Sequence, residues 1–108
     1  MPAVKLIVAY PTPTDIEAFE KRYVEEHVPM AVEKLGGKTK LVATKILSMA
    51  DGSDAPYYRV ADVHFPSMEA LNACAVSQGG QETIAHAIEI SSGGPPLFMV
   101  AEEEVFEF

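Results

Sequence analysis

Segments of strand character and segments of helix character alternate along this chain, and their order is the feature that most restricts its fold. Runs rich in β-branched and other apolar residues, bounded by proline, glycine and other turn formers, are typical of strands. These runs lie at residues 4–10, 40–49, 57–65 and 97–106. Between the first two runs, and again between the last two, apolar residues recur every three or four positions, as they do on one face of a helix. The predicted order is therefore β, α, β, β, α, β.

Local signals mark where the two helical regions begin. Thr14 followed three residues later by Glu17 has the form of a capping box, so the first helix is predicted to begin at Thr14. The second helical region is predicted to begin after Ser67, which can cap a helix. Gly79 and Gly80 interrupt that region. We therefore expect either one broken helix or two short ones.

This order of elements predicts an α+β domain of the ferredoxin-like βαββαβ kind, with a four-stranded antiparallel sheet and the helices on one face. The 108 residues provide one modest core, so residues 1–108 are predicted to form a single domain. The other face of the sheet would be left bare, and the strands are too apolar on both faces to lie in water. We expect a second copy to cover this face, giving a homodimer of the α/β-barrel type.

Composition and charge argue against several classes of function. The net charge of -8 disfavours nucleic acid or an acidic membrane as a partner. The single cysteine, Cys74, cannot form an internal disulfide, and no cysteine and histidine spacing matches a zinc site. No glycine pattern of a nucleotide-binding loop, long apolar segment or export signal is found, so we expect no cofactor and a cytoplasmic protein.

A Tyr-x-x-x-His-x-Pro segment late in the first helix carries the candidate chemistry. Tyr23 and His27 are one helical turn apart on the inward, apolar face, where the imidazole can act as acid or base and the phenol as hydrogen-bond donor. Pro29 lacks an N–H group, so the helix is predicted to bend just past His27 and to open a pocket. Phe19 and Met30 share the inward stripe and are candidates for substrate binding.

Other polar residues have less local support. His64, near the end of the third strand, is a candidate for substrate binding that could face either the helices or the dimer interior. Arg59 could hold a substrate carboxylate or pair with an acidic residue, and His86, opposite the apolar residues of its helix, is predicted to be solvated. A structural alternative also remains open, in which His27 is an interior histidine bonded to a backbone carbonyl and Tyr23 is packing.

Three segments together make the chain similar to the EthD family. They are the Tyr-x-x-x-His-x-Pro motif, the first strand Val-Lys-Leu-Ile-Val-Ala-Tyr, and Phe-Pro-Ser-Met-Glu-Ala-Leu after the third strand. The resemblance implies a dimeric ferredoxin-like protein from a family named for bacterial ether degradation. It also implies relatives that are isomerases or cyclases of lactones or polyketides, and family-level labels of oxidoreductase. The positions that match the working histidine and tyrosine are His27 and Tyr23.

Three functions follow as hypotheses. The first is a small-molecule enzyme or binding protein of catabolic or secondary metabolism, of isomerase, cyclase or oxidoreductase type. It would act on a small hydrophobic or aromatic metabolite between helix and sheet, with His27 as acid or base and Tyr23 as hydrogen-bond donor. The second is a non-catalytic accessory protein that binds a hydrophobic metabolite or a partner enzyme. The third is a haem-related monooxygenase with His27 as the axial ligand.

Overall fold

The computed structural model describes residues 3–108 and has the predicted order of strands and helices. The elements in chain order are β1 (Ala3–Pro11), α1 (Ile16–Arg22), the π-helical turn η1 (Tyr23–His27), α2 (Val28–Lys34), β2 (Lys40–Lys45), β3 (Tyr57–Phe65), α3 (Met68–Val76), α4 (Gln78–Ile90) and β4 (Leu97–Glu103). The strands form one antiparallel sheet in the order β2-β3-β1-β4. This topology confirms the ferredoxin-like fold.

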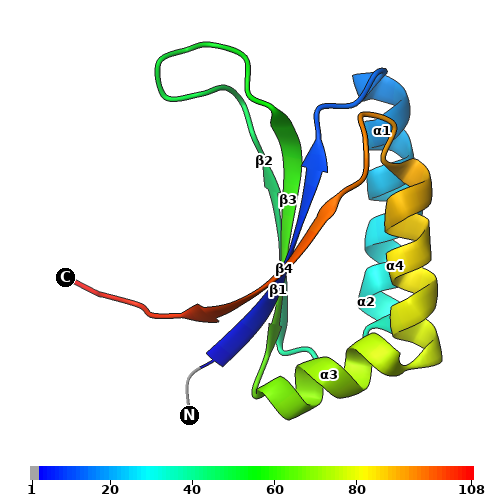
Figure 1. Ribbon diagram of the computed structural model, residues 1–108, viewed down its shortest axis with the longest axis vertical. Helices are drawn as coiled ribbons and strands as arrows, with labels where there is room; N and C mark the ends of the chain where they lie inside the picture. Colours follow the sequence, from blue (N-terminus) through cyan, green and yellow to red (C-terminus); the bar gives the residue numbers. More distant parts are fainter. Residues whose placement is uncertain (1–2) are drawn as a thin grey trace.

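All helices lie on one side of the sheet, and the other side is uncovered in the chain (Figure 1). Strand residues point alternately to the two sides. On β1, Val4, Val8 and Tyr10 point toward the helices and are buried, and Lys5 and Ile7 point to the uncovered side. The sheet therefore has one face that builds a core and one that is free to meet a partner.

The N-cap of the first helix lies one residue later than predicted. Asp15 is its N-cap, because its carboxylate accepts a hydrogen bond from the Ala18 N–H group at 3.1 Å. The N–H group of Thr14 instead donates to the hydroxyl of Ser92 at 3.2 Å. A contact with a distant loop therefore displaced the predicted capping box, and Glu17 remains as an acidic residue of the first turn, where it suits the helix dipole.

The predicted irregularity near Pro29 takes the form of a π-helical turn. The N–H group of Val28 donates to the carbonyl of Tyr23, five residues earlier, and Pro29 lies in the first turn of α2, the regular helix that follows. A proline ring inside a regular helix clashes with the carbonyl four residues before it, and a wider turn relieves such a clash. The irregular turn is the five-residue segment that begins with Tyr23 and ends with His27.

The second helical region consists of two helices that meet at Ser77. The Ser77 hydroxyl accepts a hydrogen bond from the Gly80 N–H group at 3.0 Å and so caps α4. A Cβ atom at position 80 would lie 1.9 Å from the carbonyl oxygen of Cys74, so only glycine fits there. This tight corner lets α4 pack against α2 and η1.

Two groups of buried residues fill the space between sheet and helices. The aliphatic cluster consists of Val4, Ala31, Leu35, Val63, Phe65, Leu71 and Cys74. The aromatic cluster consists of Val8, Tyr10, Phe19, Tyr23, Ala61, Ala87 and Ile90. Leu6 packs against both clusters, so they adjoin near the middle of β1.

Candidate functional site

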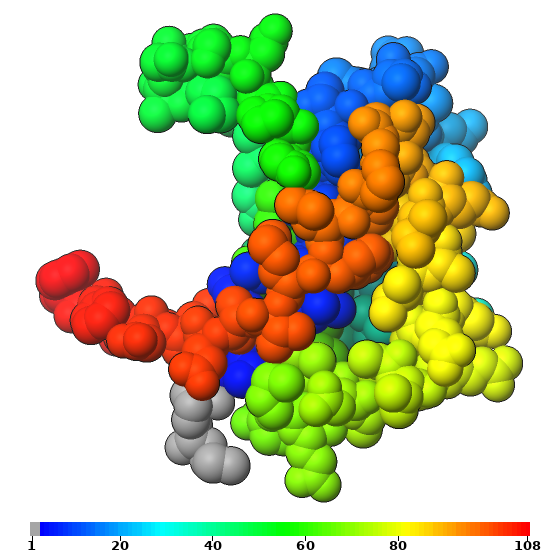
Figure 2. All heavy atoms as spheres, viewed as in Figure 1, coloured from blue at the N-terminus to red at the C-terminus, as the bar shows by residue number. Residues whose placement is uncertain are grey.

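A cavity of about 240 Å³ lies between the sheet and the helices, and residues of both clusters line it. Phe98 and Val100 of β4 line it as well, although they are 37% and 55% exposed. The cavity therefore reaches solvent beside β4, where Figure 2 shows a hollow between β4 and α4. A small molecule has a route from solvent to the interior here.

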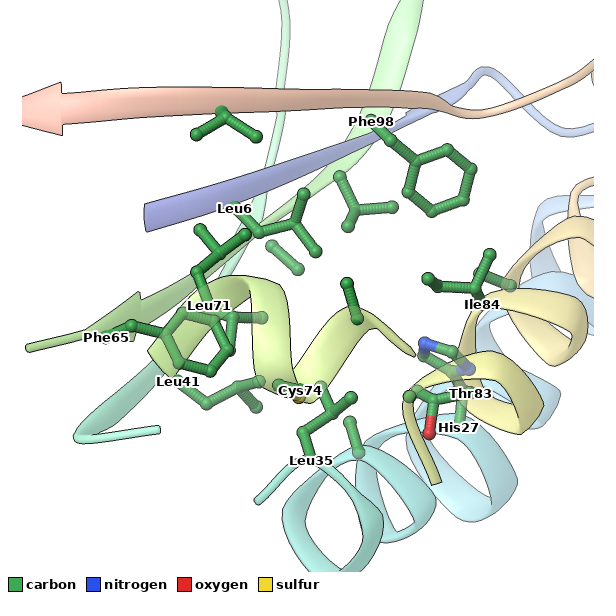
Figure 3. A pocket seen from close by; sticks show the side chains of 18 of the residues that line it. Leu6, His27, Leu35, Leu41, Phe65, Leu71, Cys74, Thr83, Ile84 and Phe98 are labelled. Carbon is green, nitrogen blue, oxygen red and sulfur yellow. The ribbon is translucent and has the colours of Figure 1, made fainter. Parts of the chain in front are cut away.

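The cavity has two chemically different ends (Figure 3). The apolar end is lined by Leu35, Leu41, Phe65, Leu71 and Cys74. The histidine end is lined by Tyr10, Tyr23, His27, Thr83 and Ile84. In Figure 3 the ring of His27 lies beside Thr83 and Ile84, away from Leu41, Phe65 and Leu71. A ligand with an apolar body and one polar group matches this arrangement.

Tyr23 and His27 are neighbours at the histidine end, as their spacing predicted. Their rings stack with centroids 5.8 Å apart, and the two residues are 1% and 7% exposed. Burial raises the pKa of the Tyr23 phenol, so it stays protonated and can donate a hydrogen bond. Burial, followed by the charge of His86, lowers the pKa of His27 to about 4. At neutral pH His27 is therefore uncharged, with one nitrogen that donates and one that accepts.

Tyr10 is a residue of this site that the sequence reasoning missed. It is fully buried at the end of β1, and its hydroxyl group lies 3.1 Å from Nε2 of His27. Burial, and next the proximity of Tyr23, raises the pKa of Tyr10 far above its ordinary value. The alternation of β1 places Tyr10 on the same side as Val8, which was the one signal in the sequence that could have pointed to it.

His86 was predicted to be solvated, and this prediction is wrong. Its side chain is 12% exposed, its ring stacks on His27 with centroids 5.2 Å apart, and the two Nδ1 atoms are 2.9 Å apart. The buried face of α4 runs through Gly80, Thr83, Ala87 and Ile90. The prediction placed the apolar residues of this helix inward, but one of them, Ile88, is 54% exposed, so the inward face was placed at the wrong angle.

Arg59 lies behind the histidine end and does not line the cavity. Its guanidinium donates two hydrogen bonds to the carboxylate of Glu20, at 2.8 and 2.9 Å, and lies 4.9 Å from the centre of the Tyr23 ring. The hydrogen bond from Arg59 lowers the pKa of Glu20. Because this carboxylate occupies the guanidinium, Arg59 has the acidic partner that we considered and is not placed to hold a substrate.

The other predicted binding residues also lie outside the cavity lining. His64 points to the uncovered face of the sheet, where its Nδ1 atom is 3.7 Å from the carboxylate of Glu103. Phe19 is buried behind the site, stacked on Tyr23 with ring centroids 5.6 Å apart. Met30 is half-buried on α2. Of the six residues predicted for the site, the structure brings Tyr23 and His27 to the cavity.

Cys74 lines the apolar end of the cavity and is buried. Burial raises the pKa of its thiol, so it behaves as a small apolar residue rather than a nucleophile. Within residues 3–108, no group of three or more histidine, cysteine or acidic side chains is arranged to hold a metal ion. In the same part of the chain, no helix is long and apolar enough to cross a membrane.

The fold and the cavity define a ferredoxin-like α+β protein with a small, partly polar interior site. Residues 11–88 match the EthD domain, and this range covers well over half of the chain. The chain belongs to the EthD family.

Similar proteins match nearly the whole chain. An uncharacterized 11.0 kDa protein from the thcB-thcC intergenic region of Rhodococcus erythropolis is 29% identical over 101 residues, which cover 94% of this chain and 96% of the relative. The crystal structure of an EthD family protein from Bacillus halodurans has a TM-score of 0.87 at 24% identity, covering 94% of this chain and 99% of that one. A dimeric ferredoxin-like protein from Jannaschia sp. CCS1 has a TM-score of 0.65 at 16% identity, covering 95% and 99%. These structural similarities show a shared fold.

Proposed function

We propose that this EthD-family protein binds a small molecule with an apolar body and one polar group, and that His27 acts on it as acid or base. The observation that carries the proposal is the cavity itself, which joins an apolar end to an end where Tyr23 and His27 lie side by side. Buried titratable groups in a concave apolar site are the usual mark of an active or binding site.

The size of the cavity restricts the ligand. A volume of about 240 Å³ lies below the range of roughly 300 to 1,000 Å³ that is usual for drug-sized ligands. It exceeds the roughly 150 Å³ that holds one benzene molecule. A single ring with one or two substituents therefore fits best, and its polar group would lie toward His27.

The chemistry follows from the protonation of the two rings. Neutral His27 can accept a proton at Nε2 through the hydroxyl group of Tyr10, which lines the cavity, and Tyr23 can donate a hydrogen bond to an oxygen on which negative charge develops. His27 takes its own hydrogen bond from Tyr10, which leaves Tyr23 to serve the ligand. Because these groups move protons, we favour an isomerase or cyclase type of reaction over the oxidoreductase type.

The haem hypothesis finds no support in this site. An axial histidine needs a free ring nitrogen to bind iron. Both nitrogens of His27 are engaged, one with Tyr10 at 3.1 Å and one with His86 at 2.9 Å. The residues present therefore do not fit a haem held by His27.

The second candidate function is non-catalytic binding of a hydrophobic metabolite. The mostly aliphatic lining of the cavity favours it, because such a lining binds apolar molecules without any chemical step. Under this function, replacing His27 with Gln would leave ligand binding unchanged.

One experiment separates the two functions, with cyclohexanone as the probe, since it is one apolar ring with a carbonyl group. In D2O we expect the protein to accelerate exchange of the protons beside the carbonyl, followed by NMR. His27→Ala should slow this exchange by about 100-fold or more. Binding of cyclohexanone without exchange would favour the non-catalytic function, and no binding at all would contradict both.

The control is the other deeply buried histidine. His64→Gln changes a side chain that is 6% exposed but lies on the opposite face of the sheet, so the exchange rate should stay at the wild-type level. A loss in this variant equal to the loss in His27→Ala would show that the effect is not local to the cavity.

The protein is further proposed to be a homodimer that packs through the uncovered face of its sheet. Val42, Leu97 and Met99 point to this face and are 36 to 43% exposed, and an apolar sheet face of this kind usually marks an interface. The Jannaschia protein of the same fold is described as dimeric. Met99→Asp should convert the dimer to a folded monomer in analytical ultracentrifugation, and an unchanged sedimentation profile would contradict this interface.

A further inference from the structure

Four side chains form a continuous series from the cavity to the surface. The hydroxyl group of Tyr10 lies 3.1 Å from Nε2 of His27, and Nδ1 of His27 lies 2.9 Å from Nδ1 of His86. Nε2 of His86 lies 3.4 Å from the carboxylate of Glu26, whose side chain is 50% exposed. The series joins β1, η1 and α4, so groups that are distant in sequence are held in hydrogen-bonding contact.

The outer end of the series is a charged acceptor. Arg22 donates two hydrogen bonds to Glu26, at 3.3 and 3.2 Å, and these hold the pKa of that carboxyl group below its ordinary value. An ionised carboxylate can only accept hydrogen bonds. Nε2 of His86 must therefore carry a proton and donate a hydrogen bond to Glu26.

This requirement fixes the direction of every other hydrogen bond while the imidazoles are neutral. A neutral imidazole has one donor and one acceptor nitrogen. Since Nε2 of His86 donates, its Nδ1 must accept, so Nδ1 of His27 must donate. Nε2 of His27 must then accept, and Tyr10 must supply the proton. A surface carboxylate thus selects the tautomer of the histidine in the cavity.

We propose that His86 and Glu26 form a proton path that connects His27 to solvent and fix His27 in the Nδ1-protonated tautomer. Both are positioning residues, because they act through His27 and Glu26 does not line the cavity. The role of His86 and Glu26 in turnover rests on the function proposed above, but the assignment of the His27 tautomer does not.

The transfer along this path is balanced. When Tyr10 passes its proton to Nε2 of His27 and takes one from the ligand in its place, the Nδ1 proton of His27 passes to Nδ1 of His86, and the Nε2 proton of His86 passes to Glu26 or to water. Each imidazole remains neutral and changes tautomer. When the proton returns to the ligand, the steps run in reverse and the tautomers are restored, as a reaction that removes and returns one proton requires.

The charged groups around the path do not alter the direction of its hydrogen bonds. On the solvent side, Arg22 also pairs with Glu89 of α4 at 2.7 Å, which fastens the guanidinium next to Glu26. On the inner side, Tyr23 separates His27 from the Arg59–Glu20 pair. No other charged side chain within residues 3–108 forms a hydrogen bond or an ion pair with His27 or His86.

The test is NMR of the protein labelled with 15N in histidine, at about pH 8, where an ordinary imidazole is neutral. We expect His27 to carry its proton on Nδ1 and His86 on Nε2. In Glu26→Gln the carboxylate is replaced by an amide that can donate as well as accept, so both rings should show a mixture of tautomers. A proton on Nε2 of His27 in the wild type, or an unchanged spectrum in Glu26→Gln, would overturn the proposal.

A matched control exists one residue away. Glu25 is exposed and lies in the same turn, so Glu25→Gln removes an equal charge without touching His86, and the tautomers should not change. A similar tautomer mixture in this variant would mean that general charge, not the contact with His86, sets the tautomer, and would also overturn the proposal. The spectra require no ligand, so failure of the cyclohexanone experiment would leave this result standing, and the reverse also holds.

Discussion

The two ends of the cavity are built on different physical principles. The apolar end is formed by side chains such as Leu35, Phe65 and Leu71, whose contribution to stability depends on the area and volume that they bury. The histidine end is formed by Tyr10, Tyr23 and His27, which are packed as closely but also joined by edge-to-face rings and hydrogen bonds. The residues of both ends are buried, but only those of the histidine end make contacts that depend on direction.

Because of this difference, we expect the apolar end to determine which ligand binds and the histidine end to determine the chemistry. Non-directional packing tolerates substitutions that conserve volume, so the apolar end can change its ligand without losing the fold. Directional hydrogen bonds lose their function when a single atom is removed. We therefore expect substitutions at the apolar end to act on stability and ligand size, and those at the histidine end to act on protonation.

The largest expected effect is on stability at the apolar end. Leu71 is 4% exposed on α3, so Leu71→Ala should destabilise the protein by about 3–4 kcal/mol, through lost burial and an enlarged cavity. The free energy of unfolding in urea measures this. The histidine tautomers should remain unchanged in the same variant, because no hydrogen bond of the histidine end involves Leu71.

Val76→Ala is the matched control, since it shortens an apolar side chain on the same helix that is 73% exposed. Its effect should stay within about 0.5 kcal/mol. If both variants lower the free energy of unfolding equally, or if Leu71→Ala alters the histidine tautomers, the two ends are not independent.

The second effect is on the pH dependence of stability. The pKa of His27 is about 4 in the folded protein and about 6.5 in an unfolded chain. Between these values the unfolded chain binds more protons, so stability falls as the pH decreases from about 6.5 to 4. The loss assigned to His27 is about 3 kcal/mol at most. The measurement is the difference between wild type and His27→Gln in urea unfolding across this range.

The slope of stability against pH should be flatter in His27→Gln than in the wild type, because glutamine does not titrate. Parallel curves for wild type and His27→Gln would show that burial of His27 does not lower its pKa.

Much of the fold follows from short-range patterns in the sequence. Alternation and turn residues predicted the four strands, and the three- and four-residue spacing placed Tyr23 and His27 on one inward face. The second helical region was predicted as one broken helix or two, and the break lies at Ser77, two residues before the first glycine. These features depend on residues close to one another in the chain, which is why they could be predicted.

The rest of the site depends on contacts between distant segments. The hydroxyl group of Tyr10 and the ring of His86 both reach His27, across 17 and 59 positions of the sequence respectively. Which face of α4 is buried depends on its packing against α2 and η1, and an error in placing that face was enough to predict His86 in solvent. A contact between distant segments also explains why Arg59 does not line the cavity, since its partner Glu20 is 39 positions away.

The smallest expected effect distinguishes the two tyrosines of the histidine end. Tyr10→Phe removes the hydrogen bond to Nε2 of His27 and leaves that buried nitrogen unpaired, so it should cost about 1–2 kcal/mol in urea unfolding. Tyr23→Phe keeps the stacked ring and removes a hydroxyl group that does not bond His27, so it should cost less. Conversely, Tyr23→Phe should slow the exchange of cyclohexanone protons by weakening stabilisation of the oxygen, without changing the tautomer of His27. If Tyr23→Phe proves the more destabilising variant, or if Tyr10→Phe leaves the Nε2 resonance of His27 unmoved, then Tyr10 is not the residue that orients this imidazole.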